Sequence, residues 1–223
     1  MYCPKSFIKK ARKVIRKKLS FVNSRPIFLN NKRLRILSLL VKIIPGNRKI
    51  YMQKFIRTLR QGMEIMSGKP NEIAMPLCYW RSGEKPAQGN FDPANDGCGL
   101  MWYMALVPMK KDIVTCYSEM AKKVCLDNDI DPFITLTTVS EQCFESTIPI
   151  LFDRNNKDSL IRAQKCYDEL FEGGKKIGVL PNRLSIEHMH YFETTAPEAT
   201  DLIRKLHKAL DPERIMSPGR YGV

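Results

Sequence analysis

From residue 99 onward, short apolar segments alternate with longer amphipathic ones, and this alternation limits the fold more than any other feature. The apolar segments are rich in β-branched and aromatic residues and predict strands. The amphipathic segments repeat apolar residues every three or four positions and predict helices. In chain order the expected strands and helices are 100–109, 110–129, 132–140, 146–154, 157–178, 179–192 and 194–211. The order strand, helix, strand, strand, helix, strand, helix predicts an α+β fold: an antiparallel sheet with helices on one face, preceded by basic N-terminal helices.

Proline and glycine refine this prediction. Pro149 lacks an amide hydrogen, so its strand is expected toward an edge of the sheet. The helix that starts at Lys157 opens with an Asp-Ser cap, and the pair Gly173-Gly174 is expected to end it. Asp211-Pro212 ends the last helix, and Pro218-Gly219 then predicts a turn in the C-terminal tail.

The positive charge lies almost entirely in the first quarter of the chain. Residues 1–60 hold 18 of the 37 lysines and arginines and none of the 23 acidic residues. Segment 6–22 is a basic amphipathic helix, and further helices are expected in 30–46 and 48–68. Such a block suits an anionic membrane surface, an acidic protein or nucleic acid, but it also suits solvated helix faces. It has no nucleic-acid motif and little aromatic interleaving, so no nucleic-acid partner is expected.

The cysteines indicate a reducing compartment. Seven cysteines are scattered without a CxxC pair or regular spacing, which argues against a disulfide framework and a zinc site. No apolar run is long enough for a membrane-spanning helix, and the N-terminus lacks the apolar core of a secretory signal. Free thiols in a cytoplasmic protein fit these facts.

Few residues are arranged for catalysis by sequence spacing alone. His188 and His190 would share one face of a strand and could bind a metal together, but no third ligand is in view, so no metal is expected. Glu187 would point away from His188 on a strand. Cys98 in DGCG is a candidate nucleophile, for which a buried thiol is the simpler interpretation.

Two arginines have a less ordinary setting. Arg183 follows Pro181-Asn182 beside a buried strand, and Arg220 stands between Gly219 and Gly222 in the tail. A cation next to an apolar strand needs an anionic partner. A structural salt bridge and an anionic substrate or reduced cofactor both meet that need.

Several blocks, taken in order, resemble FAD-linked oxidases of the vanillyl-alcohol oxidase and para-cresol methylhydroxylase family. The blocks are PLCYWRS, DPANDGCGLMWYMALVPM, PFITLTTVSEQCFESTIPILFDR, GVLPNRLSIEHM and ALDPERIMSPGRYG. Together they cover residues 68–222 and match the C-terminal cap domain of that family. The resemblance implies two parts, a basic helical segment 1–67 and a cap domain 68–223.

The resemblance also implies roles for individual residues. Family members oxidise para-substituted phenols by hydride transfer to the flavin, and a Tyr-Arg pair binds the phenolate. Here the arginine is Arg183, but the tyrosine position is Asn182, which weakens the case for a phenol. Arg220 matches an arginine near the flavin. Gly99 matches the histidine that bonds FAD covalently in some relatives, so FAD is expected to bind noncovalently.

The family's FAD-binding domain has no counterpart in the sequence. The expected partners are therefore an FAD-binding domain or subunit in cis or in trans, a small aromatic substrate, and a cytochrome or other electron acceptor. A fragment, one half of a split enzyme and a product of gene decay all fit this expectation. The alternative is a noncatalytic module whose residues 1–60 bind an anionic membrane or an acidic protein.

Overall fold

The computed structural model describes residues 4–22, 27–43, 45–82, 86 and 89–220. The chain divides into two compact units, Met1–Ala74 and Met75–Val223. We describe each unit by itself. The division falls near the expected boundary at residue 67, while the assignment of 68–223 as a cap domain stays a prediction. Every helix in the described ranges is too short or too polar to cross a membrane.

The first unit is helical and thinly packed. It contains η1 (Lys5–Phe7), α1 (Ile8–Lys18), α2 (Asn31–Val41) and α3 (Asn47–Met66). The side chain of Asn30 caps α2 by accepting a hydrogen bond from the Arg33 amide at 2.9 Å. Among the described residues of this unit, the buried apolar side chains are Leu34, Val41 and Ile56.

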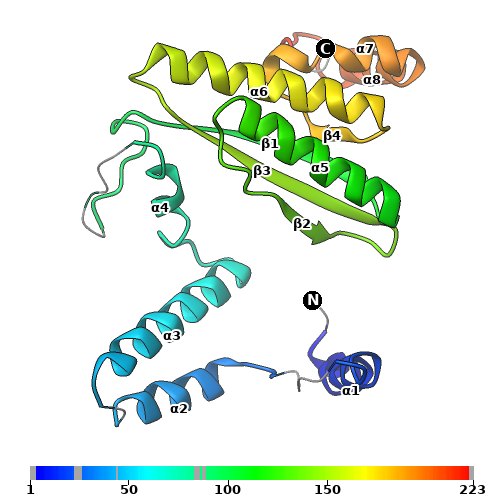
Figure 1. Cartoon of the computed structure of the whole chain (residues 1–223). Coiled ribbons are helices and arrows are strands. Elements are labelled where there is room, and N and C mark those ends of the chain that lie inside the picture. Colours follow the sequence, from blue (N-terminus) through cyan, green and yellow to red (C-terminus); the bar gives the residue numbers. More distant parts are fainter. Residues whose placement is uncertain (1–3, 23–26, 44, 83–85, 87–88, 221–223) are drawn as a thin grey trace. The chain divides into compact units, whose positions relative to one another are not determined.

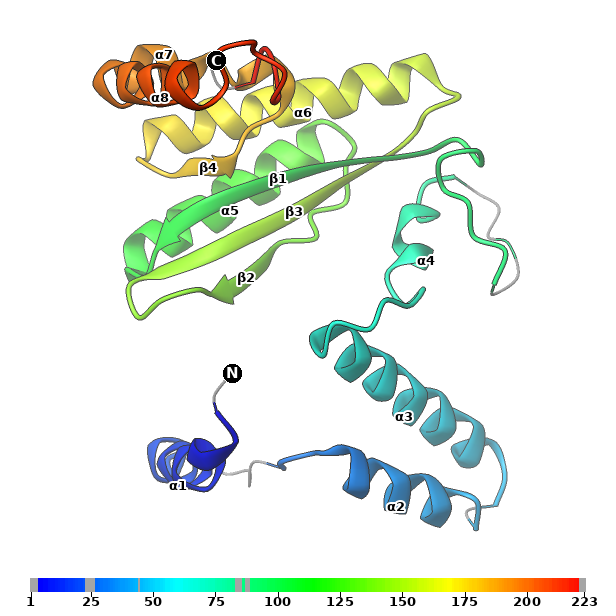
Figure 2. The same cartoon turned by 180° about the vertical axis from the view of Figure 1, so that it is seen from behind.

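The second unit carries the sheet and most of the helices. Its elements are α4 (Met75–Cys78), β1 (Cys98–Pro108), α5 (Lys111–Asp127), β2 (Thr135–Thr138), β3 (Cys143–Asp153), α6 (Lys157–Lys176), β4 (Leu180–Arg183), η2 (Ile186–His188), α7 (Tyr191–Thr195) and α8 (Pro197–Leu210). The four strands pair antiparallel in the order β2-β3-β1-β4. Helices α5 and α6 lie side by side on one face of the sheet (Figures 1 and 2). The predicted α+β class, with helices on one face, is confirmed.

The core lies between the sheet and these two helices. Alternate residues of β1 and β3 point toward the helices and are fully buried, among them Tyr103, Ala105 and Ile148. The helices contribute small and aromatic side chains such as Ala121 and Tyr167. Helix α7 joins this layer because Tyr191 packs edge-on against Phe171 of α6, with ring centroids 5.0 Å apart.

Three local expectations were wrong. Strand β3 is internal, although β2 pairs only with its residues 144–147, so Pro149 lies beyond the last β2 contact. Helix α6 continues through Gly173-Gly174 to Lys176. These glycines allow close packing: a Cβ on Gly174 would lie 2.5 Å from the Val179 carbonyl oxygen and 2.7 Å from the Tyr103 hydroxyl. The α6 cap is Asn156, whose side chain accepts from the Ser159 amide.

The segment after β4 also differs from the prediction. The expected strand 179–192 ends at Arg183, and the chain then forms η2 and α7. The apolar residues of this segment pack against α6 rather than a neighbouring strand: Met189, Tyr191 and Phe192 all lie against the core. His188 and His190 are therefore not on one face of a strand.

Candidate functional site

The sheet face opposite α5 and α6, which we call the open face, combines exposed apolar side chains with polar ones. By strand alternation, Leu100, Trp102, Met104 and Leu106 of β1 all point to it. Trp102 is 46% exposed and Leu106 is 41% exposed. This is an apolar platform large enough for an aromatic ring, and its surroundings decide what such a ring would meet.

A β-bulge at the edge strand places polar groups beside this platform. Met104 pairs with Arg183, but Ala105 pairs with Pro181, so Asn182 is the extra residue on β4. The Asn182 side-chain amide donates to the Glu145 carboxylate of β3 at 2.8 Å. Glu145 lies opposite Leu106 and therefore also on the open face. Strict alternation would have put the side chains of Asn182 and Arg183 on opposite faces of the sheet. Because of the bulge, both can lie on the open face.

Arg183 is the cation of the open face. Its register partner Met104 places it there, and the residue is exposed. Its guanidinium makes no hydrogen bond or ion pair with any of the residues that the structure describes. An unpaired guanidinium beside an apolar surface can bind a phenolate or a carboxylate through charge-assisted hydrogen bonds.

Glu145 is the site residue that sequence reasoning missed. It is a half-buried carboxylate near the start of β3, and its bond to Asn182 spans 37 positions in sequence. An acidic residue next to apolar and hydroxyl side chains of a strand was the available signal. Its polar partner could not be found that way, because the pairing depends on the bulge.

Gly99 lies on the other side of the sheet. It pairs with Phe152 of β3, and a Cβ on Gly99 would lie 2.4 Å from that ring. The Phe152 ring thus fills the space that a side chain at Gly99 would need. The structure supplies a packing reason for this glycine, and its predicted role near a cofactor stays a prediction.

The tail that carries Arg220 is held by a buried carboxylate. Asp211 follows α8 and is 4% exposed, and its two oxygens accept from the Ile215 amide at 3.1 Å and the Met216 amide at 2.8 Å. These bonds, mainly that from Met216, hold the pKa of Asp211 below its usual value. The Arg220 amide donates to the Ser217 carbonyl at 3.3 Å. No hydrogen bond between described residues links Arg220 to β4, and the expected position of Arg220 near a flavin stays a prediction.

The histidines form no metal site. His188 lies between Ser185, whose Oγ is 2.7 Å from Nδ1, and Asp168, whose Oδ1 is 3.1 Å from Nε2. Its ring packs against those of Tyr167 and Phe171. Within the described ranges, no three His, Cys, Asp or Glu residues are grouped to hold a metal ion. His188 therefore has structural partners that account for its position.

The loop before β1 is pinned by polar contacts. Tyr79 hydrogen-bonds Asp96 and accepts from the Asp92 amide at 2.8 Å. Removal from water and the Asp96 carboxylate raise the pKa of Tyr79 to about 12. Trp80 and Arg81 both donate to Asp131 at 2.8 Å.

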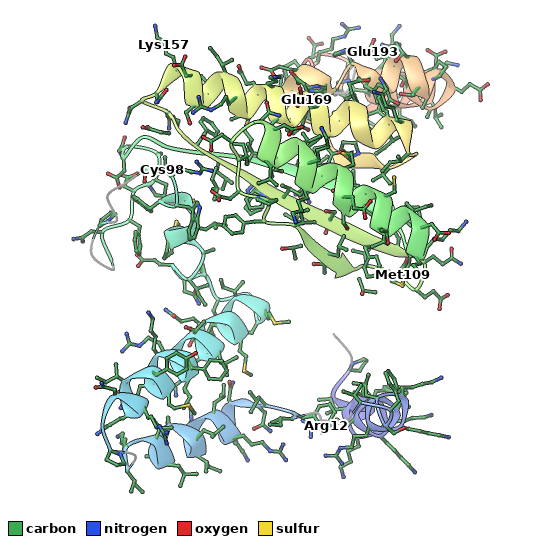
Figure 3. All side chains as sticks on the ribbon, in the orientation of Figure 1. Arg12, Cys98, Met109, Lys157, Glu169 and Glu193 are labelled. Carbon is green, nitrogen blue, oxygen red and sulfur yellow. The ribbon has the colours of Figure 1, made fainter. Side chains whose placement is uncertain are left out.

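Cys98, labelled in Figure 3 where this loop enters β1, is 7% exposed and lies 3.5 Å from the Ser82 hydroxyl. Burial and the absence of a histidine beside it leave a structural thiol as its simplest interpretation.

Comparison with known proteins points to flavoenzymes. The chain is 27% identical over 210 residues to the 1'-carboxy-chondrochloren decarboxylase of Chondromyces crocatus, covering 94% of this chain and 38% of that protein. It is 26% identical over 161 residues to the 4-cresol dehydrogenase [hydroxylating] flavoprotein subunit of Pseudomonas putida, covering 72% of this chain and 28% of that protein. No protein-family profile matches the sequence.

Two solved structures share the fold. The crystal structure of p-cresol methylhydroxylase with substrate bound aligns with all of this chain at a TM-score of 0.64 and 20% identity. The 4-ethylphenol oxidase of Gulosibacter chungangensis, in complex with isoeugenol, aligns with all of it at 0.62 and 18% identity. The chain spans 37% and 38% of those two proteins. It therefore resembles part of an FAD-linked oxidase, as the sequence blocks predict.

Proposed function

We propose that this chain forms the substrate-covering part of an FAD-linked oxidoreductase that oxidises a para-substituted phenol or a related alcohol. The observation that carries the proposal is the open face, where an apolar platform adjoins the unpaired guanidinium of Arg183. The similarity of this chain to one part of longer flavoenzymes supports the proposal. A flavin-binding domain or subunit, in cis or in trans, completes the site.

The residues of the open face fit the substrate side of such a site. Trp102 and Leu106 offer apolar surface to an aromatic ring. Arg183 stabilises the ionised oxygen of a phenol and so raises the fraction of phenolate bound. Asn182, which holds Glu145 by its amide, keeps that carboxylate from turning toward the guanidinium. When bound, FAD would accept the hydride. The partner domain would bind the phosphates of FAD, and Arg220 would lie near its flavin ring.

Two classes of anionic substrate, phenolates and carboxylates, could bind to the Arg183 guanidinium. A guanidinium binds a carboxylate as readily as a phenolate. One relative is named as a decarboxylase of a carboxylated compound and another as a dehydrogenase of 4-cresol. We therefore include 4-cresol and 4-hydroxyphenylacetate as separate probes.

The test begins with reconstitution. The purified chain is mixed with FAD and a candidate flavin-domain protein, and retained flavin absorbance is measured after gel filtration. Anaerobic addition of each probe should then bleach the flavin of the complex. Failure to retain FAD with any flavin-domain partner would remove the proposal.

Arg183 provides the sharper test. Arg183→Gln should weaken phenolate or carboxylate binding about tenfold to a hundredfold, since a hydrogen bond to a charged group contributes ~1.5–3 kcal/mol. Arg183→Lys should restore part of it. Arg162→Gln, on α6 and 42% exposed, removes the same charge away from the open face and should have no effect. Equal losses in both glutamine variants would show a nonspecific charge effect.

A second candidate function rests on α1. None of the described side chains of this helix is buried, and Val14 is 51% exposed between closely spaced lysines and arginines. A basic amphipathic helix of this kind binds anionic membrane surfaces. Flotation with vesicles containing phosphatidylglycerol should recover the chain at low salt and not at high salt. Val14→Asp should reduce recovery, while unchanged recovery would argue against this function.

A further inference from the structure

An open pocket lies between α2 and α3, and its polar lining is entirely basic or neutral. Its volume is about 340 Å³. Lys42, Arg57 and Arg60 supply three cations, and Ser38, Gln53 and Gln61 supply hydroxyl and amide groups around Ile56. No carboxylate is among the lining residues. This pocket belongs to the helical unit and takes no part in the site proposed above.

The pocket collects its cations through helix periodicity. Gln53, Arg57, Arg60 and Gln61 are spaced by three or four residues and so share one face of α3. Ser38 and Lys42 are four residues apart at the C-terminal end of α2. Ile56, which is 6% exposed, is the apolar residue of the lining. Lys42, Arg57 and Arg60 are exposed, and the pairing of α2 with α3 brings them to one pocket.

The charges of this pocket are unbalanced. The side-chain cations of Lys42, Arg57 and Arg60 make no ion pair or hydrogen bond with any residue in the described part of the chain. Like charges three residues apart on a helix, such as Arg57 and Arg60, destabilise it. A bound anion would reverse the sign of this interaction and take up the free donors.

We propose that this pocket binds a phosphate monoester or diphosphate group. Guanidinium groups match phosphate oxygens in bidentate fashion, the lysine adds a point charge, and the amides add neutral donors. The volume exceeds that of a single phosphate, so the phosphate can carry an attached group. A soluble organic phosphate and a lipid headgroup share this chemistry, and the test separates the two sources.

The test uses the full chain and inorganic pyrophosphate as the soluble probe. Titration calorimetry should show saturable binding with one site. Arg57→Gln and Arg60→Gln should each weaken it about tenfold or more, because each removes a charge-assisted contact. Lys54→Gln removes the same charge from α3 outside the pocket and should leave the affinity unchanged. Circular dichroism verifies that each variant keeps its helices, and Lys42→Gln is the fallback if a variant on α3 unfolds.

The lipid arm uses vesicles of phosphatidylcholine with equal charge from either phosphatidic acid, a phosphate monoester, or phosphatidylglycerol, a diester. Preference for phosphatidic acid that is lost in Arg57→Gln but kept in Lys54→Gln identifies a lipid source. Pyrophosphate binding without that preference identifies a soluble source. Absence of both, or equal losses in Lys54→Gln and Arg57→Gln, would overturn the proposal. Flavin retention plays no part in either arm, so the outcome is independent of the oxidoreductase proposal.

Discussion

The two units of this protein bury their apolar side chains to very different degrees. In the sheet unit, α5 and α6 lie on one face of the four-stranded sheet, and the core side chains are almost completely removed from water. In the helical unit, only Leu34, Val41 and Ile56 are buried among the described apolar residues, while Leu39 and Ile50 are 60% and 66% exposed. Both units have abundant apolar residues, so composition does not explain the contrast.

The contrast shows what a second layer does. A sheet faced by two helices buries alternate side chains of every strand, and burial contributes about 25 cal/mol per Å² of apolar surface. In the first unit, α2 buries two side chains, α3 buries one and none of the described side chains of α1 is buried, while residues 1–60 hold 18 lysines and arginines. The sheet unit can therefore hold its fold by its own core, while the helical unit has apolar surface left for a partner. The following predictions test this difference.

The largest expected effect is in the sheet core. Ile150→Ala should lower the free energy of unfolding of the sheet unit by about 2–5 kcal/mol, because Ile150 is fully buried and a cavity remains. Both tryptophans, Trp80 and Trp102, lie in this unit, so tryptophan fluorescence in urea follows its unfolding alone. Leu34→Ala, in the helical unit, should leave that transition unchanged. A shift of the fluorescence midpoint in Leu34→Ala would show that the units unfold together.

A matched pair of glycines should respond with opposite signs. Gly174→Ala should destabilise the sheet unit by about 1–3 kcal/mol, because the new Cβ would lie 2.5 Å from a backbone carbonyl oxygen. Gly62→Ala, inside the C-terminal part of α3 with no atom within 4 Å of the new Cβ, should stabilise the helical unit by about 0.5–1 kcal/mol. Thermal unfolding followed by circular dichroism measures both. Destabilisation by Gly62→Ala would mean that α3 is more closely packed than this structure shows.

Asp211 should control the order of the tail without affecting the core. Its pKa is lowered in the folded chain, so its stabilising effect is complete above the unfolded pKa of about 3.9 and is lost as pH falls through the lower, folded value. Asp211→Asn should speed hydrogen exchange at the Ile215 and Met216 amides near neutral pH and abolish the acid dependence. Glu213→Gln, an exposed carboxylate in the same loop, is the control. Equal exchange rates in wild type and Asp211→Asn would contradict the claim that Asp211 orders the tail.

The smallest effect is expected in α1. Val14→Ser should change the free energy of unfolding by no more than about 0.5 kcal/mol, because Val14 is half exposed. The same urea titration, followed by circular dichroism, measures it. A loss above about 1 kcal/mol would show that α1 packs against a surface and would weaken the case for a membrane-facing helix.

Much of the fold could be predicted because its signals are local. The alternation of apolar strands and amphipathic helices after residue 99 predicted the order of the first six elements and the antiparallel sheet. The errors arose where packing overrides a local signal. Gly173-Gly174 resembles a helix end but allows α6 to approach its neighbours, and Pro149 resembles an edge signal but lies in β3 where β2 has already ended.

The candidate site was predicted only in part. Arg183 could be selected from the sequence, because a cation beside an apolar strand needs a partner, and Asn182 was selected through the resemblance to the oxidase family. Glu145 could not be assigned to them, and the position of Gly99 against Phe152 required the β1–β3 register. The Asp211 anchor of the tail was also missed, since a helix-ending Asp-Pro pair gives no sign of the two amides it will bind.

The sequence by itself determined most of the strands and helices and where the charge lies, because these depend on neighbours a few residues away. Only the tertiary structure decided which side chains share a face. A bulge at Asn182, a register between β1 and β3, and the packing of α2 on α3 each join residues that are distant along the chain. Such contacts depend on the balance of packing over the whole unit, and no local pattern encodes them.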